Sequence, residues 1–102
     1  MSVQKINKSN LETVKNSKRP VLLDFYAQWC GPCRTVGPIL EALASEREDY
    51  MFAKVNVAES PDIAKEYGVF SIPTMVVLNE GREVSRAVGL RSRKQLSDML
   101  DG

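Results

Sequence analysis

The chain contains two cysteines, Cys30 and Cys33, with two residues between them. A Cys-x-x-Cys pair can close to a disulfide and reopen, so its chemistry is thiol–disulfide exchange with a thiolate as the nucleophile. The pair directly follows an apolar segment at 21–27 and directly precedes a segment whose apolar residues have helical spacing. A Cys-x-x-Cys at the junction of a strand and a helix is typical of a redox motif. The sequence therefore predicts a thiol–disulfide oxidoreductase.

A helix that begins at Gly31 or Pro32 would give the two cysteines different roles. Cys30 would be the N-cap and Cys33 would lie one turn inside, with Cβ atoms about 5–6 Å apart. A small adjustment brings them to the roughly 3.5–4.5 Å that a disulfide needs. The helix dipole and the free backbone amides lower the pKa of a thiol at a helix start. We therefore predict that Cys30 attacks a client disulfide and that the less exposed Cys33 resolves the mixed disulfide.

Other uses of two cysteines fit this chain less well. A structural disulfide across so short a loop would contribute only about 2 kcal/mol by the entropic estimate. Zinc usually takes four Cys or His ligands, whereas this chain has two Cys and no His, so we expect no metal unless two chains share one. Haem attachment needs a His after the second cysteine, where Arg34 stands. No Gly-x-Gly-x-x-Gly segment is present, so we expect no nicotinamide or flavin cofactor, and electrons must come from a partner.

Length, composition and charge limit the remaining possibilities. The 102 residues have room for one core, so residues 1–102 are expected to form a single domain. The chain is 43% hydrophobic and 26% charged, as in soluble globular proteins, and its net charge of +1 argues against binding to nucleic acid or an anionic membrane. Residues 1–8 lack the apolar core of a secretory signal, and no apolar stretch approaches the roughly 18 residues of a membrane span. Two cysteines are too few for the disulfide framework of a small secreted protein, so we expect a cytoplasmic protein.

Apolar spacing and turn residues predict the elements that position the motif. Strands are predicted at 21–27, 52–57, 74–78 and 83–88. Helices are predicted at 9–16, after the cysteines through Ala44, at 61–67 and from 92 to about 100. The order is βαβαβα followed by ββα, counting a first strand before residue 9 to which these signals assign no bounds. Alternating strands and helices predict a parallel section, and the segment 74–88 predicts an antiparallel hairpin, so the sheet should be mixed with helices on both faces.

Short motifs mark the ends of the predicted helices. Residues 9–12 and 92–95 both have the sequence of a capping box, in which a serine and an acidic or amide side chain satisfy each other's backbone amides. The Ser-Pro pair at 60–61 fits the N-cap and first position of a helix, and Gly68 fits the position after a helix end. Pro38 lies inside the helical pattern that follows the cysteines and is expected to kink it.

The motifs and their order over residues 3–100 resemble the thioredoxin family. The matching segments are Asp-Phe-Tyr-Ala-Gln-Trp-Cys-Gly-Pro-Cys at 24–33, Pro38, 54–57, 67–69, 72–74, Gly81 and 88–89. The resemblance implies the thioredoxin fold, an α/β arrangement with a mixed central sheet of about five strands flanked by about four helices. It also implies a monomeric protein-disulfide reductase that is re-reduced by thioredoxin reductase and acts on disulfide-containing client proteins. The alternative is a non-catalytic binding module that uses the same groove, around Trp29 and Pro73, as a scaffold.

Some positions depart from the pattern of the family. Tyr26 stands where many members have a second tryptophan, and Gly37 stands where alanine is common. Ala58 replaces a common carboxylate, and Phe-Ser at 70–71 replaces a frequent Arg-Gly pair. We expect these differences to affect partner preference and not the chemistry.

Asp24 is the one charged residue in the apolar segment 21–27. From the residues alone it could equally be a carboxylate at a polar strand end. The resemblance implies a buried acid beneath the dithiol, with a pKa raised by burial, that takes the Cys33 proton during resolution. Lys54 on the neighbouring predicted strand is expected to approach Asp24, although a surface lysine is the alternative.

The resemblance also implies a surface on which a client docks. Pro73 would carry a cis peptide bond, in place of the more common trans bond, and bring the Ile72 backbone beside Cys30, where it could pair with an extended client segment. The expected docking residues are Trp29, Gly31, Pro32, Ile72, Pro73, Val88 and Gly89. Core packing for Val88 and a turn for Gly89 are the alternatives. Gly31 and Pro32 would in addition tune the cysteine pair to act as a reductant, because the Gly-Pro pair is found in the reducing members of the family.

Overall fold

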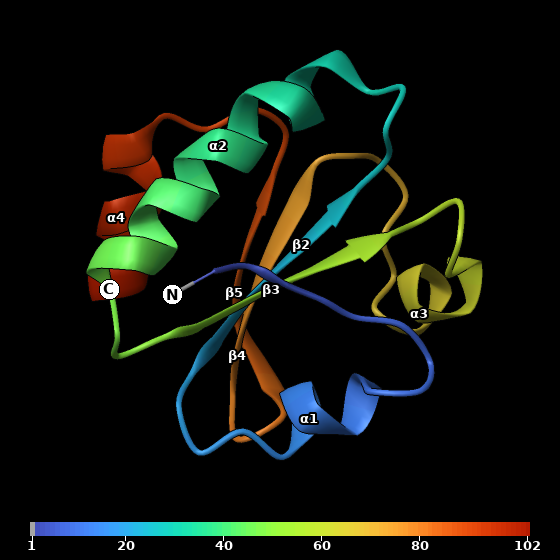
Figure 1. Ribbon diagram of the computed structural model, residues 1–102, viewed down its shortest axis with the longest axis horizontal. Coiled ribbons are helices and arrows are strands. Elements are labelled where there is room, and N and C mark those ends of the chain that lie inside the picture. The colour runs from blue at the N-terminus through green and yellow to red at the C-terminus, as the bar shows by residue number, and fades with distance from the viewer. Residues whose placement is uncertain (1) are drawn as a thin grey trace.

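A five-stranded mixed sheet lies at the centre of the molecule, with strand order β1-β3-β2-β4-β5 (Figure 1). The computed structural model describes residues 2–102. The strands are β1 (Gln4–Lys5), β2 (Val21–Tyr26), β3 (Met51–Asn56), β4 (Thr74–Asn79) and β5 (Arg82–Val88). The helices are α1 (Leu11–Lys15), α2 (Gly31–Glu46), α3 (Pro61–Glu66) and α4 (Arg93–Asp101). The predicted α/β fold and element order are confirmed, with a first strand of two residues that the sequence did not locate.

The sheet is parallel on one side and antiparallel on the other. Strand β3 pairs in parallel with both β1 and β2, whereas β4 is antiparallel to both β2 and β5. The predicted mixed sheet with a C-terminal hairpin is therefore confirmed. None of the helices within residues 2–102 is long and apolar enough to cross a membrane.

The two faces of the sheet support separate apolar cores. Helices α2 and α4 cover one face and α1 and α3 the other (Figure 1). Successive side chains of a strand point to opposite faces. In β2, Leu23 and Phe25 accordingly pack in the core beneath α1 and α3, and Leu22 packs in the core beneath α2 and α4. Burial on both faces explains why β2 is almost continuously apolar.

The predicted helix ends are largely confirmed. At 92–95 the capping box forms, with the Gln95 amide donating to Ser92 Oγ at 3.1 Å and the Ser92 amide donating to Gln95 Oε1 at 2.9 Å. Ser60 is the N-cap of α3, and Gly68 follows the helix end with a φ of 62°. Helix α2 runs without interruption through Pro38, so this proline does not end the helix, and its kink stays a prediction.

The capping box predicted at 9–12 is wrong. Helix α1 begins at Leu11, with Asn10 as its N-cap. The Ser9 hydroxyl donates instead to Asn7 Oδ1 at 2.6 Å, and the Asn7 amide donates to Asn10 Oδ1 at 2.8 Å. The side chains of Asn7 and Asn10 therefore stabilise the turn before the helix. Ser9 bonds to Asn7 within that turn and does not cap the helix.

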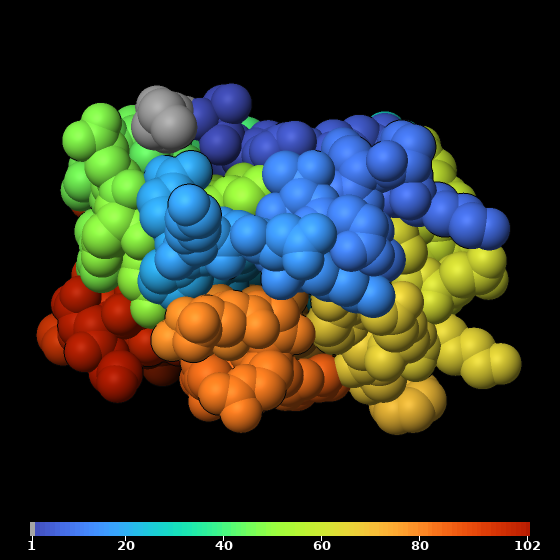
Figure 2. Space-filling view, turned by 90° about the horizontal axis from the view of Figure 1, so that it is seen from below, coloured from blue at the N-terminus to red at the C-terminus, as the bar shows by residue number. Residues whose placement is uncertain are grey.

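The β4–β5 hairpin turns at Glu80 and Gly81, whose φ angles of 53° and 79° are both positive, as in a type I′ turn. The turn packs against the end of α1, and the hairpin lies beside the segment that follows α1 in Figure 2. A Cβ atom on Gly81 would lie 2.9 Å from the Lys15 carbonyl oxygen, closer than such atoms approach.

We expect Gly81→Ala to lower the free energy of unfolding by about 1–3 kcal/mol, because it combines a strained φ with this backbone clash. Urea denaturation measures the change. Gly37→Ala is the matched control. Gly37 lies within α2 with open space around it, so there alanine should stabilise the helix by up to about 1 kcal/mol. Equal effects of the two substitutions would contradict the role assigned to the turn.

Candidate active site

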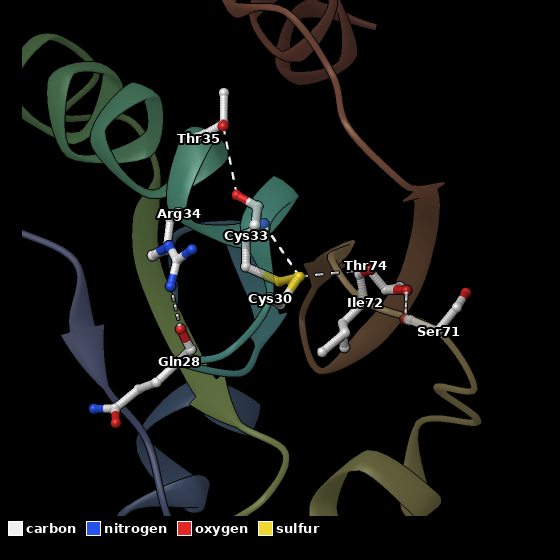
Figure 3. Close-up of a disulfide and its surroundings, with 9 residues drawn as sticks. Gln28, Cys30, Cys33, Arg34, Thr35, Ser71, Ile72 and Thr74 are labelled. Atoms are coloured by element: carbon white, nitrogen blue, oxygen red, sulfur yellow. Dashed lines mark hydrogen bonds between the residues drawn. A yellow bond between two sulfur atoms is a disulfide. The ribbon is translucent and has the colours of Figure 1, made fainter.

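The two cysteines lie at the start of α2, directly after the short turn that follows β2. Cys30 is the N-cap and Cys33 lies in the first turn, as predicted. They are joined as a disulfide with Cα atoms 5.2 Å apart (Figure 3). The Cys33 backbone amide donates to Cys30 Sγ at 3.2 Å. When the bond is reduced, this donor and the helix dipole favour the thiolate form of Cys30.

Exposure alone does not assign the nucleophile, because 6% of Cys30 and 5% of Cys33 is exposed. The surroundings of the two sulfurs separate the cysteines better. Cys30 Sγ lies 3.9 Å from the Ile72 carbonyl oxygen, next to the loop that leads into β4 (Figure 3). Cys33 lines a cavity of about 470 Å³ that also reaches Asp24. This arrangement suits Cys30 as the cysteine that reacts with a partner protein and Cys33 as the cysteine that exchanges a proton with Asp24.

Asp24 is buried in the middle of β2, with 3% of its surface exposed. Its Oδ1 atom has no hydrogen-bond partner among residues 2–102, which excludes an acid whose oxygens are all satisfied by backbone amides. Burial disfavours the charged form and raises the pKa of Asp24 to about 7, while the positive charge of Lys54 acts in the opposite direction. A carboxyl group with this pKa, facing the cavity beside Cys33, can accept and return a proton near neutral pH.

Lys54 lies opposite Asp24 in the parallel pairing of β2 with β3. It takes part in none of the ion pairs within residues 2–102, so it forms no direct ion pair with Asp24, although its positive charge still lowers the pKa of the Asp24 carboxyl. Its ammonium group lies over the ring of Tyr26, 5.6 Å from the ring centroid. Lys54 is half-buried and lines the same cavity as Asp24, so it acts on the carboxyl through its field and not through a contact.

The loop before β4 brings a second backbone segment to the dithiol. The Ile72-Pro73 peptide bond is cis, as the resemblance implied. The Thr74 hydroxyl donates to the Ser71 carbonyl at 2.6 Å, which ties the loop to the start of β4 (Figure 3). The Gly89 amide donates to the Pro73 carbonyl at 2.8 Å, so the end of β5 lies next to the same loop.

Most of the predicted docking residues are exposed around this loop. Trp29 is 72% and Val88 47% exposed, which argues against core packing for Val88. Gly31 and Pro32 are exposed, Ile72 is half-buried and Pro73 is buried. Gly89 has a positive φ of 93°, which fits the alternative role of a turn glycine.

Sequence reasoning missed two exposed apolar residues near the site. Phe70 is 96% exposed and lies two residues before Ile72, and Leu90, directly after Gly89, is 52% exposed. The signal for Phe70 was present in the sequence as a departure from the Arg-Gly pair frequent at 70–71. No cluster of three or more His, Cys, Asp or Glu suited to a metal occurs in the described part of the chain.

A disulfide at a helix start, a buried acid beneath it and a cis proline beside it make a specific combination. The family model described as Thioredoxin matches residues 2–102. The chain belongs to the thioredoxin family. It is accordingly a thiol–disulfide oxidoreductase, and its redox centre is the pair formed by Cys30 and Cys33.

Individual members of the thioredoxin family are similar over most of this chain. A thioredoxin of Chlorobaculum thiosulfatiphilum is 42% identical over 94 residues, which are 90% of this chain and 87% of the relative. A bifunctional thioredoxin reductase/thioredoxin of Mycobacterium leprae is 39% identical over 105 residues, covering 98% of this chain and 23% of that protein. The solved structure of a mutant thioredoxin from Halobacterium salinarum is 37% identical, with a TM-score of 0.91, and the match covers 98% of this chain and 88% of that one.

Proposed function

We propose that this chain carries electrons from a thioredoxin reductase to disulfide-containing client proteins, as a monomeric single domain in the cytoplasm. The observation that carries the proposal is the position of Cys30, whose sulfur accepts the Cys33 amide at 3.2 Å at the start of α2. A thiolate stabilised in this way is the nucleophile that disulfide exchange requires. The relative in Mycobacterium leprae, named as both reductase and thioredoxin, supports the choice of electron donor. The lack of a dinucleotide-binding motif in this sequence supports an external donor.

The reaction takes place in two exchanges. The Cys30 thiolate attacks one sulfur of the client disulfide, forming a mixed disulfide, and the other client sulfur leaves as a thiolate. Asp24 takes the proton of the Cys33 thiol, and the resulting Cys33 thiolate attacks Cys30 Sγ and releases the second client sulfur. Two electrons have then passed to the client, the two client thiolates take up protons, and Cys30 and Cys33 are joined. A reductase that supplies two electrons and two protons restores the dithiol.

A client segment docks on the exposed residues around the sulfur of Cys30. The Ile72 backbone, beside Cys30, can form strand-like hydrogen bonds with an extended client segment. Trp29 and Val88 supply exposed apolar contacts on this surface, and Pro73 and Gly89 shape the adjoining loops. Phe70 and Leu90 are the further exposed apolar residues that extend the docking surface.

The reduction potential of the Cys30–Cys33 pair tests the proposed direction of electron flow. Trp29 adjoins Cys30 and is the only tryptophan, so its fluorescence reports the redox state in defined dithiol buffers. We expect a potential well below that of the glutathione pair. NADPH consumption with a thioredoxin reductase and insulin as the client should then depend on this chain. A potential more oxidising than that of glutathione would contradict the proposal and favour an oxidase or isomerase.

A further inference from the structure

Two groups near Lys54 could hold its ammonium. One is the carboxyl of Asp24, and the other is the ring of Tyr26. Asp24 lies opposite Lys54 in the pairing of β2 with β3, and Tyr26, two residues along β2, points to the same face of the sheet. All three line one cavity together with Cys33. Lys54 Nζ lies 5.6 Å from the centroid of the Tyr26 ring, within the roughly 6 Å of a cation–π interaction. The ring, and not the carboxyl, therefore holds the ammonium.

The other charged side chains around Asp24 make contacts with groups other than Asp24. Arg34 and Glu41 of α2 line the cavities beside Asp24, and both bond to backbone groups, at 3.2 Å and 3.4 Å. Lys5 of β1 pairs with Glu59 at 2.7 Å. Strand β4, the other neighbour of β2, contains no charged residue. Among these charged groups, Lys54 is the one whose charge lowers the pKa of Asp24.

We propose that Tyr26 is a positioning residue, whose ring keeps the Lys54 ammonium away from the Asp24 carboxyl and so preserves that carboxyl as the proton acceptor for Cys33. The catalytic consequence rests on the acid–base role proposed above for Asp24. A direct ion pair would favour the ionised form of Asp24 and lower its pKa. The weaker base would then accept the Cys33 proton less readily at neutral pH.

The test follows the titration of the Asp24 carboxyl by carbon-13 NMR in position-26 variants, with and without Lys54→Met. We expect Tyr26→Leu to lower the Asp24 pKa by about one unit, a tenfold loss of proton affinity, because the freed ammonium can approach the carboxyl. The matched control Tyr26→Phe keeps the ring and should leave the Asp24 pKa unchanged. Lys54→Met should raise the Asp24 pKa more in the Tyr26→Leu background than in the parent chain.

An unchanged Asp24 pKa in Tyr26→Leu would overturn the proposal, and so would equal effects of Lys54→Met in the two backgrounds. If Tyr26→Leu does not fold, Tyr26→Met gives the same comparison, since it also removes the ring. The pH profile of insulin reduction adds a functional readout. In Tyr26→Leu the acidic limb of the profile should move to lower pH, whereas an equal loss at every pH would indicate a structural role and contradict positioning.

The proposed acid–base role of Asp24 is tested separately by the activity of Asp24→Asn. Full activity of that variant would overturn the role of Asp24 as proton acceptor. The NMR titration of Asp24 in the Tyr26 variants would still decide whether the ring controls the distance between Lys54 and the carboxyl.

Discussion

Cys33→Ser is expected to stop disulfide exchange at the mixed disulfide, so that each chain retains one client through Cys30. The backbone amide of residue 33 still donates to Cys30 Sγ, so the first attack remains favourable. The serine hydroxyl is far less acidic than a thiol and cannot resolve the intermediate. Mass spectrometry under non-reducing conditions, after mixing the reduced variant with insulin, should show one covalent adduct per chain.

Cys30→Ser should lose the activity completely, to the rate of the uncatalysed exchange, because it removes the attacking thiolate. The double variant Cys30→Ser/Cys33→Ser is the matched control and should form no adduct. Fast adduct formation through Cys33 in Cys30→Ser would show that the roles of the two cysteines are reversed. Function retained by the double variant in a client assay would favour the binding-module alternative over electron transfer.

Asp24→Asn is expected to stabilise the fold at neutral and alkaline pH. The folded pKa of Asp24 is about 7, above the value of about 3.9 of an unfolded aspartate. Between these two pH values the folded chain holds a proton that the unfolded chain has lost. Stability therefore falls as the pH rises through this window, by about 1.4 kcal/mol per unit. Removing the carboxyl should add about 2–4 kcal/mol to the free energy of unfolding at about pH 8 and little below about pH 4.

Urea denaturation over this pH range measures the effect of Asp24→Asn. Asp62→Asn is the matched control, because Asp62 is exposed in the first turn of α3 and its substitution should change stability by at most about 0.5 kcal/mol. The same Asp24→Asn variant should reduce insulin about a hundredfold more slowly, at the low end of general acid–base effects, because solvent can also take the proton. A variant with no gain in stability at neutral pH would contradict the buried, protonated acid.

Local sequence signals were sufficient for the architecture and for the reactive pair. The apolar run of β2, the helical spacing after Cys33 and the Gly-containing loop at Gly81 each involve residues close in sequence, and each is confirmed. The position of Cys30 at the start of a helix also follows from local patterning, as does the capping box at 92–95. Where two local patterns competed, as at 9–12, the sequence could not rank them, because Asn10 and Ser9 have nearly equal preference for the N-cap.

The burial of Asp24 and its distance from neighbouring charges depend on the tertiary structure and could not be decided from the sequence. Its burial and its missing hydrogen-bond partner depend on α2 lying over β2, and the burial raises its pKa. The same holds for Lys54, whose ammonium lies on the Tyr26 ring although the strand register alone would allow contact with Asp24. Sequence spacing specifies which face of a strand a side chain occupies. Charge–charge distances, desolvation and the partner of a flexible lysine depend on packing between segments distant in the sequence, and these set the proton affinity of the acid beside Cys33.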